Sequence, residues 1–246
     1  MEIDVQLLPL RPDPASLSSR SVVVLDILRA TSVIVYALSQ GAKEFVPVLS
    51  VEEAFKKKGQ YPAGSTLLGG EKDTQQIEGF DLGNSPAEYI AEKIKDKRII
   101  LRTTNGTQAF HLISSAREVM VGSFFNIEAV ARRCIVLGLD LLVFPSGDEG
   151  RFSMEDTVCA GMIIDRTMQI MESRTTGRNG VSLTDASQAA RFLFKRFEND
   201  REEAFRLSHH GKRLIRLGRG GDLPCCARTD IVSIVPVFRE GVIRAL

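Results

Sequence analysis

The chain has 246 residues, of which 43% are hydrophobic and 26% charged, ordinary values for a globular protein with a sizeable core. Its 32 basic and 31 acidic residues leave a net charge of +1, which excludes a global field that steers the protein to nucleic acid or to an anionic membrane. Only three histidines are present, too few for a histidine-rich zinc centre. Any bound anion must therefore be held by a local site.

The ends and the cysteines indicate a cytoplasmic protein. Residues 1–20 lack a basic start followed by an apolar run, and no later stretch reaches the roughly 20 apolar residues that span a bilayer. The four cysteines contain no C-x-x-C pair, and we expect them to be reduced, small, buried side chains. We expect neither a membrane nor a nucleic-acid partner.

Apolar runs of strand length alternate with helical segments, which predicts an α/β fold with a mostly parallel or mixed sheet between helical layers, αβα. The expected strands are an edge strand at 3–8, then 22–27, 45–49, 98–102, 119–122, 139–144 and 231–238. Pro236 places the last of these at a sheet edge or a bulge.

Helices are predicted after Thr31, after Ser85 with Pro86 in the first position, and after Asn126. Further helices are expected at 153–171, at 186–197 and within the basic stretch 201–227, with a long polar loop at 173–185. No internal repeat is present. We expect one catalytic unit over 1–246, divided into two α/β lobes, 1–120 and 121–246.

The first polar cluster follows strand 22–27. Ligands of parallel α/β sheets bind at the carboxyl ends of the strands, so the strand-to-helix junctions are the candidate site. Asp26 is a carboxylate suited to a divalent cation, and Arg29, Thr31 and Ser32 offer anion-binding groups at a helix start. The alternative is that Asp26 caps the strand end and pairs with Arg29.

Two further junctions carry oxygen donors and glycines. The segment 69–85 places Glu71, Lys72, Asp81 and Asn84 among four glycines, which allow close approach of the backbone to a ligand. The next junction is a candidate phosphate cradle that consists of Thr103, Thr104, Asn105, Gly106 and Thr107.

The remaining candidates come from the last junctions and the histidines. Asn126 is either a helix cap or a ligand, and the charged segment 146–156 contributes Arg151, Glu155 and Asp156. Acidic residues are also favoured in any first helical turn, so Glu155 and Asp156 have a structural alternative. We expect His111 to be a core residue and both His209 and His210 to face solvent.

Together these donors favour phosphate-ester hydrolysis, or binding of a phosphorylated ligand, with Mg²⁺. The chain has no G-x-S-x-G elbow, no Walker A motif and no dinucleotide fingerprint, which weighs against serine hydrolases, P-loop proteins and NAD-dependent enzymes.

Five motifs, in order over about two thirds of the chain, resemble the ComB-type 2-phosphosulfolactate phosphatases. They are DILRATS at 26–32, GGE at 69–71, GFDLGNSP at 79–86, TTNGT at 103–107 and GRFSMEDTVCAG at 150–161. One departure is Lys72, where the resemblance leads us to expect an arginine. A lysine there loses bidentate geometry and could alter substrate preference.

The resemblance implies a Mg²⁺-dependent phosphatase that converts (R)-2-phospho-3-sulfolactate to 3-sulfolactate and phosphate, a step of coenzyme M biosynthesis, with a fold of its own. We expect a homodimer. The hypothesis assigns catalysis to Asp26, Arg29, Glu71 and Asp81. It assigns Mg²⁺ to Asp26, Glu71, Asp81, Glu155 and Asp156. It assigns substrate binding to Thr31, Ser32, Lys72, Asn84, 103–107, Asn126 and Arg151.

Two alternatives stay open. In the first, Asp26 is a covalent nucleophile, as in haloacid-dehalogenase-like phosphatases acting on another small phospho-acid, although Leu28 stands where those enzymes carry a second Asp. In the second, the protein binds a phosphorylated or sulfonated metabolite without catalysis.

Overall fold

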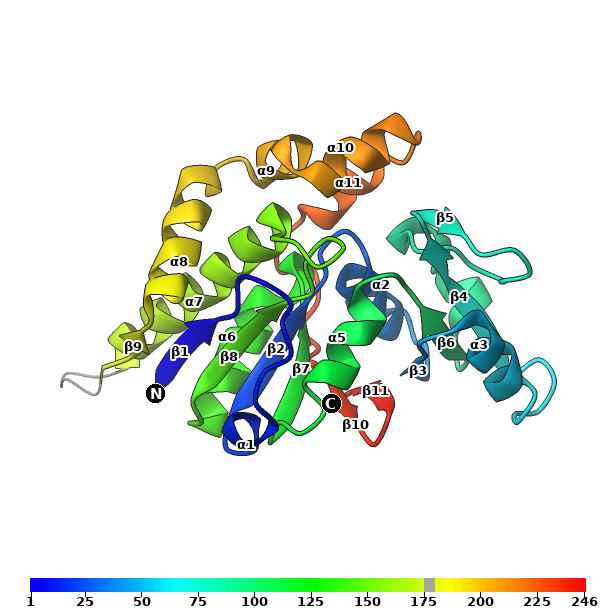
Figure 1. The fold of residues 1–246 in the computed structure, drawn as a ribbon, viewed down its shortest axis with the longest axis horizontal. Coiled ribbons are helices and arrows are strands. Elements are labelled where there is room, and N and C mark those ends of the chain that lie inside the picture. The colour runs from blue at the N-terminus through cyan, green and yellow to red at the C-terminus, as the bar shows by residue number, and fades with distance from the viewer. Residues whose placement is uncertain (175–179) are drawn as a thin grey trace.

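A computed structural model describes residues 1–174 and 180–246 of the chain (Figure 1). In these residues eleven strands form one mixed sheet in the order β5-β4-β6-β3-β11-β10-β7-β2-β8-β1-β9. The strands are β1 (Glu2–Val5), β2 (Ser21–Leu25), β3 (Glu44–Pro47), β4 (Thr66–Lys72), β5 (Gln75–Gln76), β6 (Arg98–Arg102), β7 (Glu118–Gly122), β8 (Leu141–Pro145), β9 (Ser182–Leu183), β10 (Pro236–Arg239) and β11 (Val242–Ala245). The predicted α/β class is confirmed.

Helices flank the sheet. They are α1 (Pro14–Leu17), α2 (Ala30–Ser39), α3 (Val51–Lys58), α4 (Ala91–Ile94), α5 (Gly106–Leu112), α6 (Ile127–Leu137), α7 (Met154–Arg174), α8 (Asp185–Phe197), α9 (Arg201–Leu207), α10 (His209–Arg216) and α11 (Asp222–Cys226), with 3-10 turns η1 (Pro86–Glu88) and η2 (Phe124–Asn126). Figure 1 shows α9, α10 and α11 together at one end of the molecule. None of the helices in the described residues is both long and apolar enough to span a membrane.

Strand β2 shows why the sequence forms a buried sheet. All five of its residues are buried, and successive side chains point to opposite faces. Val23 and Leu25 join the core that contains α7, whereas Val22 and Val24 join the core that contains α2 and α5. A continuous β-branched run is therefore favourable here, because both faces of the strand are covered.

A hairpin joins two parallel parts of the sheet. On one side β4, β6 and β3 are parallel, and on the other β7, β2, β8 and β1 are parallel. Between them lies the antiparallel pair β10 and β11, which contacts β7 and β3. A lobe boundary at residue 120 stays a prediction: residue 120 lies within β7, and β2, which precedes it, pairs both with β7 and with β8 after it.

Several predicted boundaries are wrong. The expected strand 231–238 begins only at Pro236 and lies inside the sheet, which is possible because Pro236 is the first residue of β10. Ser85 and Pro86 begin only a short 3-10 turn, and α2 begins one residue before Thr31. In the expected loop 173–185, β9 pairs with β1, and residues 175–179 lie outside the described residues.

The expectation that the cysteines are buried is confirmed for three of the four. All four cysteines are free; Cys134, Cys159 and Cys226 are buried and Cys225 is partly exposed.

Candidate active site

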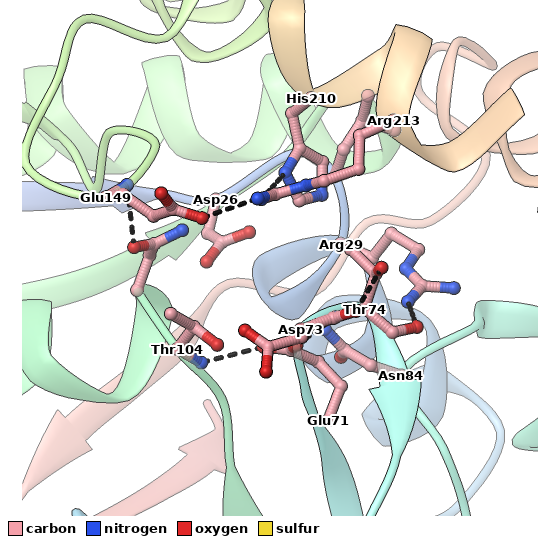
Figure 2. A pocket seen from close by; sticks show the side chains of 12 residues that line it. Asp26, Arg29, Glu71, Asp73, Thr74, Asn84, Thr104, Glu149, His210 and Arg213 are labelled. Carbon is pink, nitrogen blue, oxygen red and sulfur yellow. Dashed lines mark hydrogen bonds and ion pairs between the residues drawn. The ribbon is translucent and has the colours of Figure 1, made fainter. Parts of the chain in front are cut away.

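A pocket lies where the segments after β2, β4, β6 and β8 meet α10 (Figure 2). Its lining residues are Asp26, Leu28, Arg29, Glu71, Asp73, Thr74, Asn84, Thr104, Asn105, Glu149, His210 and Arg213. Figure 2 shows His210 and Arg213 on one side of Asp26, and Glu71 and Thr104 on the other. The pocket thus sets acidic side chains against cationic ones at the carboxyl ends of strands, where α/β proteins bind ligands.

Asp26 is a buried residue of the pocket lining. Its side chain is held by a hydrogen bond from the Ala30 backbone N–H to Oδ1 at 3.1 Å. Gly106 packs so closely that an added Cβ would lie 2.7 Å from Oδ2. Burial raises the pKa of Asp26 to about 6, against the opposing effects of the Ala30 N–H and of the charge of His210. The protein alone thus compensates the ionised carboxylate poorly, and a bound cation would do so better.

Arg29 is buried and is held by Asp222 of α11. Its Nη1 donates to Asp222 Oδ2 at 2.6 Å, its Nη2 donates to the Thr74 carbonyl at 3.2 Å, and Ser85 Oγ donates to Asp222 Oδ1 at 2.5 Å. Arg29 therefore pairs with Asp222 rather than with Asp26. Its buried Nε has no hydrogen-bond partner within the described residues, and a buried donor without a partner is costly unless a ligand satisfies it.

Glu71 joins two of the predicted junctions. Its Oε1 accepts the Thr104 N–H and its Oε2 accepts the Thr74 N–H, both at 2.7 Å. Beside it, Asn84 Oδ1 and Thr104 Oγ1 are buried and find no partner among the residues described. These oxygens are available to a cation, a water molecule or a ligand hydroxyl.

The α10 side of the pocket was missed by sequence reasoning. His210 is only 9% exposed, so the prediction that it faces solvent is wrong, and Arg213 lies one helical turn further on. Arg213 Nη2 donates to Asp148 Oδ1 at 2.8 Å. Burial alone would raise the pKa of Asp148, but hydrogen bonds from His210 and His209 and the nearby charges outweigh it and hold this pKa well below its ordinary value.

Glu155 and Asp156 are buried but do not line the pocket. Burial raises the pKa of both carboxyls, and for Asp156 the neighbouring charges of Glu155 and Asp26 add to the effect. Asp156 Oδ1 accepts the Ile27 N–H at 2.8 Å and so supports the backbone next to Asp26. This contact gives Asp156 a structural role, the alternative considered above.

The other predicted ligands do not line the pocket. Some are exposed, and others form hydrogen bonds that hold the backbone near it. Asp81, Lys72 and Arg151 are exposed; Asp81 Oδ2 pairs with Lys58 at 2.8 Å, and Arg151 pairs with Glu149 at 3.4 Å. Buried side chains that stabilise the local backbone are those of Thr31, Ser32, Thr103, Thr107 and Asn126.

Of the predictions for His209 and His111, the first is confirmed and the second is wrong. His209 is exposed, as expected, with a side chain 59% accessible. His111 is also exposed, so the expected core position is wrong. The apolar character of its neighbours misled the prediction, because His111 lies on the outer face of α5.

The donor set suits magnesium. Within 1–174 and 180–246, no three His, Cys, Asp or Glu side chains converge as a metal site. However, Mg²⁺ needs only one or two carboxylates and completes its octahedron with water and phosphate oxygens. Asp26 and Glu71, beside the unpartnered oxygen of Asn84, are residues that would hold it.

The fold and the pocket together are those of an α/β enzyme that acts on a small anion. The family model described as 2-phosphosulpholactate phosphatase matches residues 9–241. The chain therefore belongs to the 2-phosphosulfolactate phosphatase family, which confirms the resemblance found in the sequence.

Individual relatives agree over nearly the whole chain. One from Caldanaerobacter subterraneus subsp. tengcongensis is 41% identical over 93% of this chain and 91% of its own. One from Thermotoga petrophila is 42% identical over 98% and 96%, and one from Clostridium tetani is 40% identical over 93% of each. Each is named a probable 2-phosphosulfolactate phosphatase.

Proposed function

We propose that the protein hydrolyses the phosphate monoester of 2-phosphosulfolactate, releasing 3-sulfolactate and phosphate, with Mg²⁺ held by Asp26 and Glu71. Membership of the family supports the reaction. The observation that carries the proposal is the position of Asp26, a buried carboxylate in a pocket that also contains Glu71, Arg29 and Arg213. Such a pocket can hold a phosphorylated anion together with its counter-cation.

In this reaction the water oxygen bonds to phosphorus, the bond from phosphorus to the C2 oxygen breaks, and the leaving oxygen gains a proton. A bound Mg²⁺ would offset the negative charge on the phosphoryl oxygens. The unpartnered Nε–H of Arg29 donates to a phosphoryl oxygen as charge builds there, and Asp222 keeps the guanidinium in place. Asn84 Oδ1 accepts a hydrogen bond from the attacking water.

The test is phosphate release by the purified protein from 2-phosphosulfolactate and other phosphorylated C3 acids. We expect release from 2-phosphosulfolactate that a chelator abolishes and added Mg²⁺ restores. Absence of release from every compound, together with thermal stabilisation by one of them, would instead identify a binding protein. A trapped aspartyl phosphate on Asp26 would favour the covalent mechanism over direct attack by water.

Three further expectations are proposals of the same kind: a place in coenzyme M biosynthesis, location in the cytoplasm, and a homodimer. The first depends on the substrate test above. Fractionation of cells and the mass of the native protein in solution test the other two.

A further inference from the structure

The turn between α9 and α10 fixes the start of α10. Ser208 Oγ accepts the Gly211 N–H at 2.9 Å and caps the helix. A Cβ on Gly211 would lie 1.8 Å from the Phe205 carbonyl oxygen, so only glycine fits this close approach. His210 and Arg213, three residues apart, consequently lie on one face of a helix whose position is rigidly set.

Asp148 orients both cationic side chains. Its own side chain is only 5% exposed, and its Oδ1 lies 2.8 Å from Arg213 Nη2 and 3.4 Å from His210 Nδ1. Arg213 Nη2 also lies 2.8 Å from His210 Nδ1. The buried Nε of Arg213 has no partner within the described residues, so Arg213 offers one unused N–H donor at the pocket that it lines.

Glu149 holds Arg213 in a different way from Asp148. Its Oε1 accepts from Arg213 Nη1 at 2.5 Å, but its side chain is 45% exposed. An exposed ion pair contributes little free energy and is easily exchanged. Glu149 therefore acts as a placeholder, meaning that it occupies Arg213 Nη1 until a ligand arrives. An oxyanion of the ligand can then replace Glu149 as the acceptor of the Nη1 hydrogen bond, while Nη2 still donates to Asp148.

The net charge of the α10 cluster, which consists of His210, Arg213, Asp148 and Glu149, determines which kind of anion it binds best. Arg213 faces two carboxylates, Asp148 and Glu149, so these three side chains carry no net positive charge, and the charges of Arg213 and Asp148 balance once Glu149 is displaced. Such a cluster suits a monoanion that needs several hydrogen-bond donors, and it suits a phosphoryl dianion poorly. Figure 2 shows it on the opposite side of Asp26 from Glu71 and Thr104, so a substrate can place its phosphoryl group and a second anion at the two sides.

We infer that Arg213 and His210 bind the sulfonate of the substrate, that Glu149 is the group the sulfonate displaces, and that Asp148 is the positioning residue. This inference rests on the proposed function and names the residues that set its specificity. It also explains how a chain with Lys72 turned away from the pocket could recognise a sulfonate.

The experiment compares kcat/KM for 2-phosphosulfolactate with that for 2-phospholactate, which lacks only the sulfonate. We expect Arg213→Ala to lower kcat/KM about 100-fold for the first compound and less than about threefold for the second. Equal losses for both compounds would overturn the sulfonate assignment. If the wild-type protein releases phosphate from neither, the proposed function itself fails.

Arg216→Ala is the matched control, because Arg216 lies one turn further along α10 and is exposed. It should leave both values unchanged. Glu149→Gln provides a test that leaves the ion pair of Arg213 and Asp148 intact. It should lower KM about threefold for 2-phosphosulfolactate and not for 2-phospholactate. An unchanged KM for both compounds would contradict the placeholder role of Glu149.

Discussion

The ion pair between Arg29 and Asp222 is a residue-scale feature with consequences for activity. The side chains are 2% and 10% exposed, and Nη1 and Nη2 of Arg29 each donate one hydrogen bond, whereas Nε has no partner among the described residues. Buried pairs of this kind keep their geometry only if both charges are present, since an isolated buried charge is poorly solvated. Asp222 is thus expected to position Arg29 rather than to touch the substrate.

Asp222→Asn should lower kcat/KM for 2-phosphosulfolactate at least about tenfold, mainly through kcat, because Arg29 loses its fixed orientation. The control is Asp165→Asn, which removes another buried carboxylate, paired with Arg191 and Lys195 on α8. That variant should lose thermal stability but keep its kcat/KM. Equal kcat/KM in Asp222→Asn and wild type would exclude the positioning role.

At this scale the sequence predicts several pocket residues that lie at or just after the carboxyl ends of strands. Asp26, Glu71, Thr104 and Asn105 all line the pocket, because the carboxyl ends of parallel strands share one edge of the sheet. Lys72 does not join Glu71, since adjacent residues of β4 point to opposite faces.

Other members of the site could not be predicted from local patterns. Asp222, His210 and Arg213 reach the pocket from helices near the carboxyl terminus, where only tertiary packing decides which helical face turns inward. A local pattern that indicates the constrained turn before α10 is Ser208, which caps the helix, followed three residues later by Gly211.

Element boundaries were predictable where one local signal dominated. Asn126 and Gly138, the latter with φ of 62°, delimit α6 as expected. Strands β4, β5, β9 and β11 were missed because β4 contains two glycines and the other three are short edge or hairpin segments. Their pairing depends on neighbours distant in the sequence.

Gly211→Ala tests how rigidly α10 is placed. The clash with the Phe205 carbonyl must shift α10 against α9, which should cost about 2 kcal/mol or more of unfolding free energy. Urea denaturation measures this loss. Gly221→Ala is the control, since a Cβ there meets nothing within 4 Å. Equal stability of the two variants would show that the turn adapts without cost.

Across the whole molecule, one buried carboxylate joins strands from the middle of the sheet. Glu44 of β3 accepts from Arg98 Nε of β6 at 2.5 Å and from Arg244 Nε of β11 at 2.7 Å. Burial alone would raise the pKa of Glu44, but the hydrogen bonds and charges of Arg244 and Arg98 outweigh it and lower this pKa. The ionised form therefore stabilises the folded state.

Because the folded-state pKa lies below the ordinary value of 4.5, this stabilisation is present above pH 4.5 and disappears as pH falls through the lowered pKa. Glu44→Gln should therefore lower Tm by about 5 °C at neutral pH. The difference from wild type should shrink in acid. A difference independent of pH would show that the carboxylate charge is not its source.

We expect phosphate-ester hydrolysis to take place in the pocket around Asp26. The most direct test is the rate of phosphate release from 2-phosphosulfolactate by Asp26→Asn and Asp81→Asn, which make the same change inside and outside the pocket. We expect Asp26→Asn to lose about a thousandfold or more in kcat and Asp81→Asn to keep the wild-type rate. Wild-type turnover by Asp26→Asn would contradict the account.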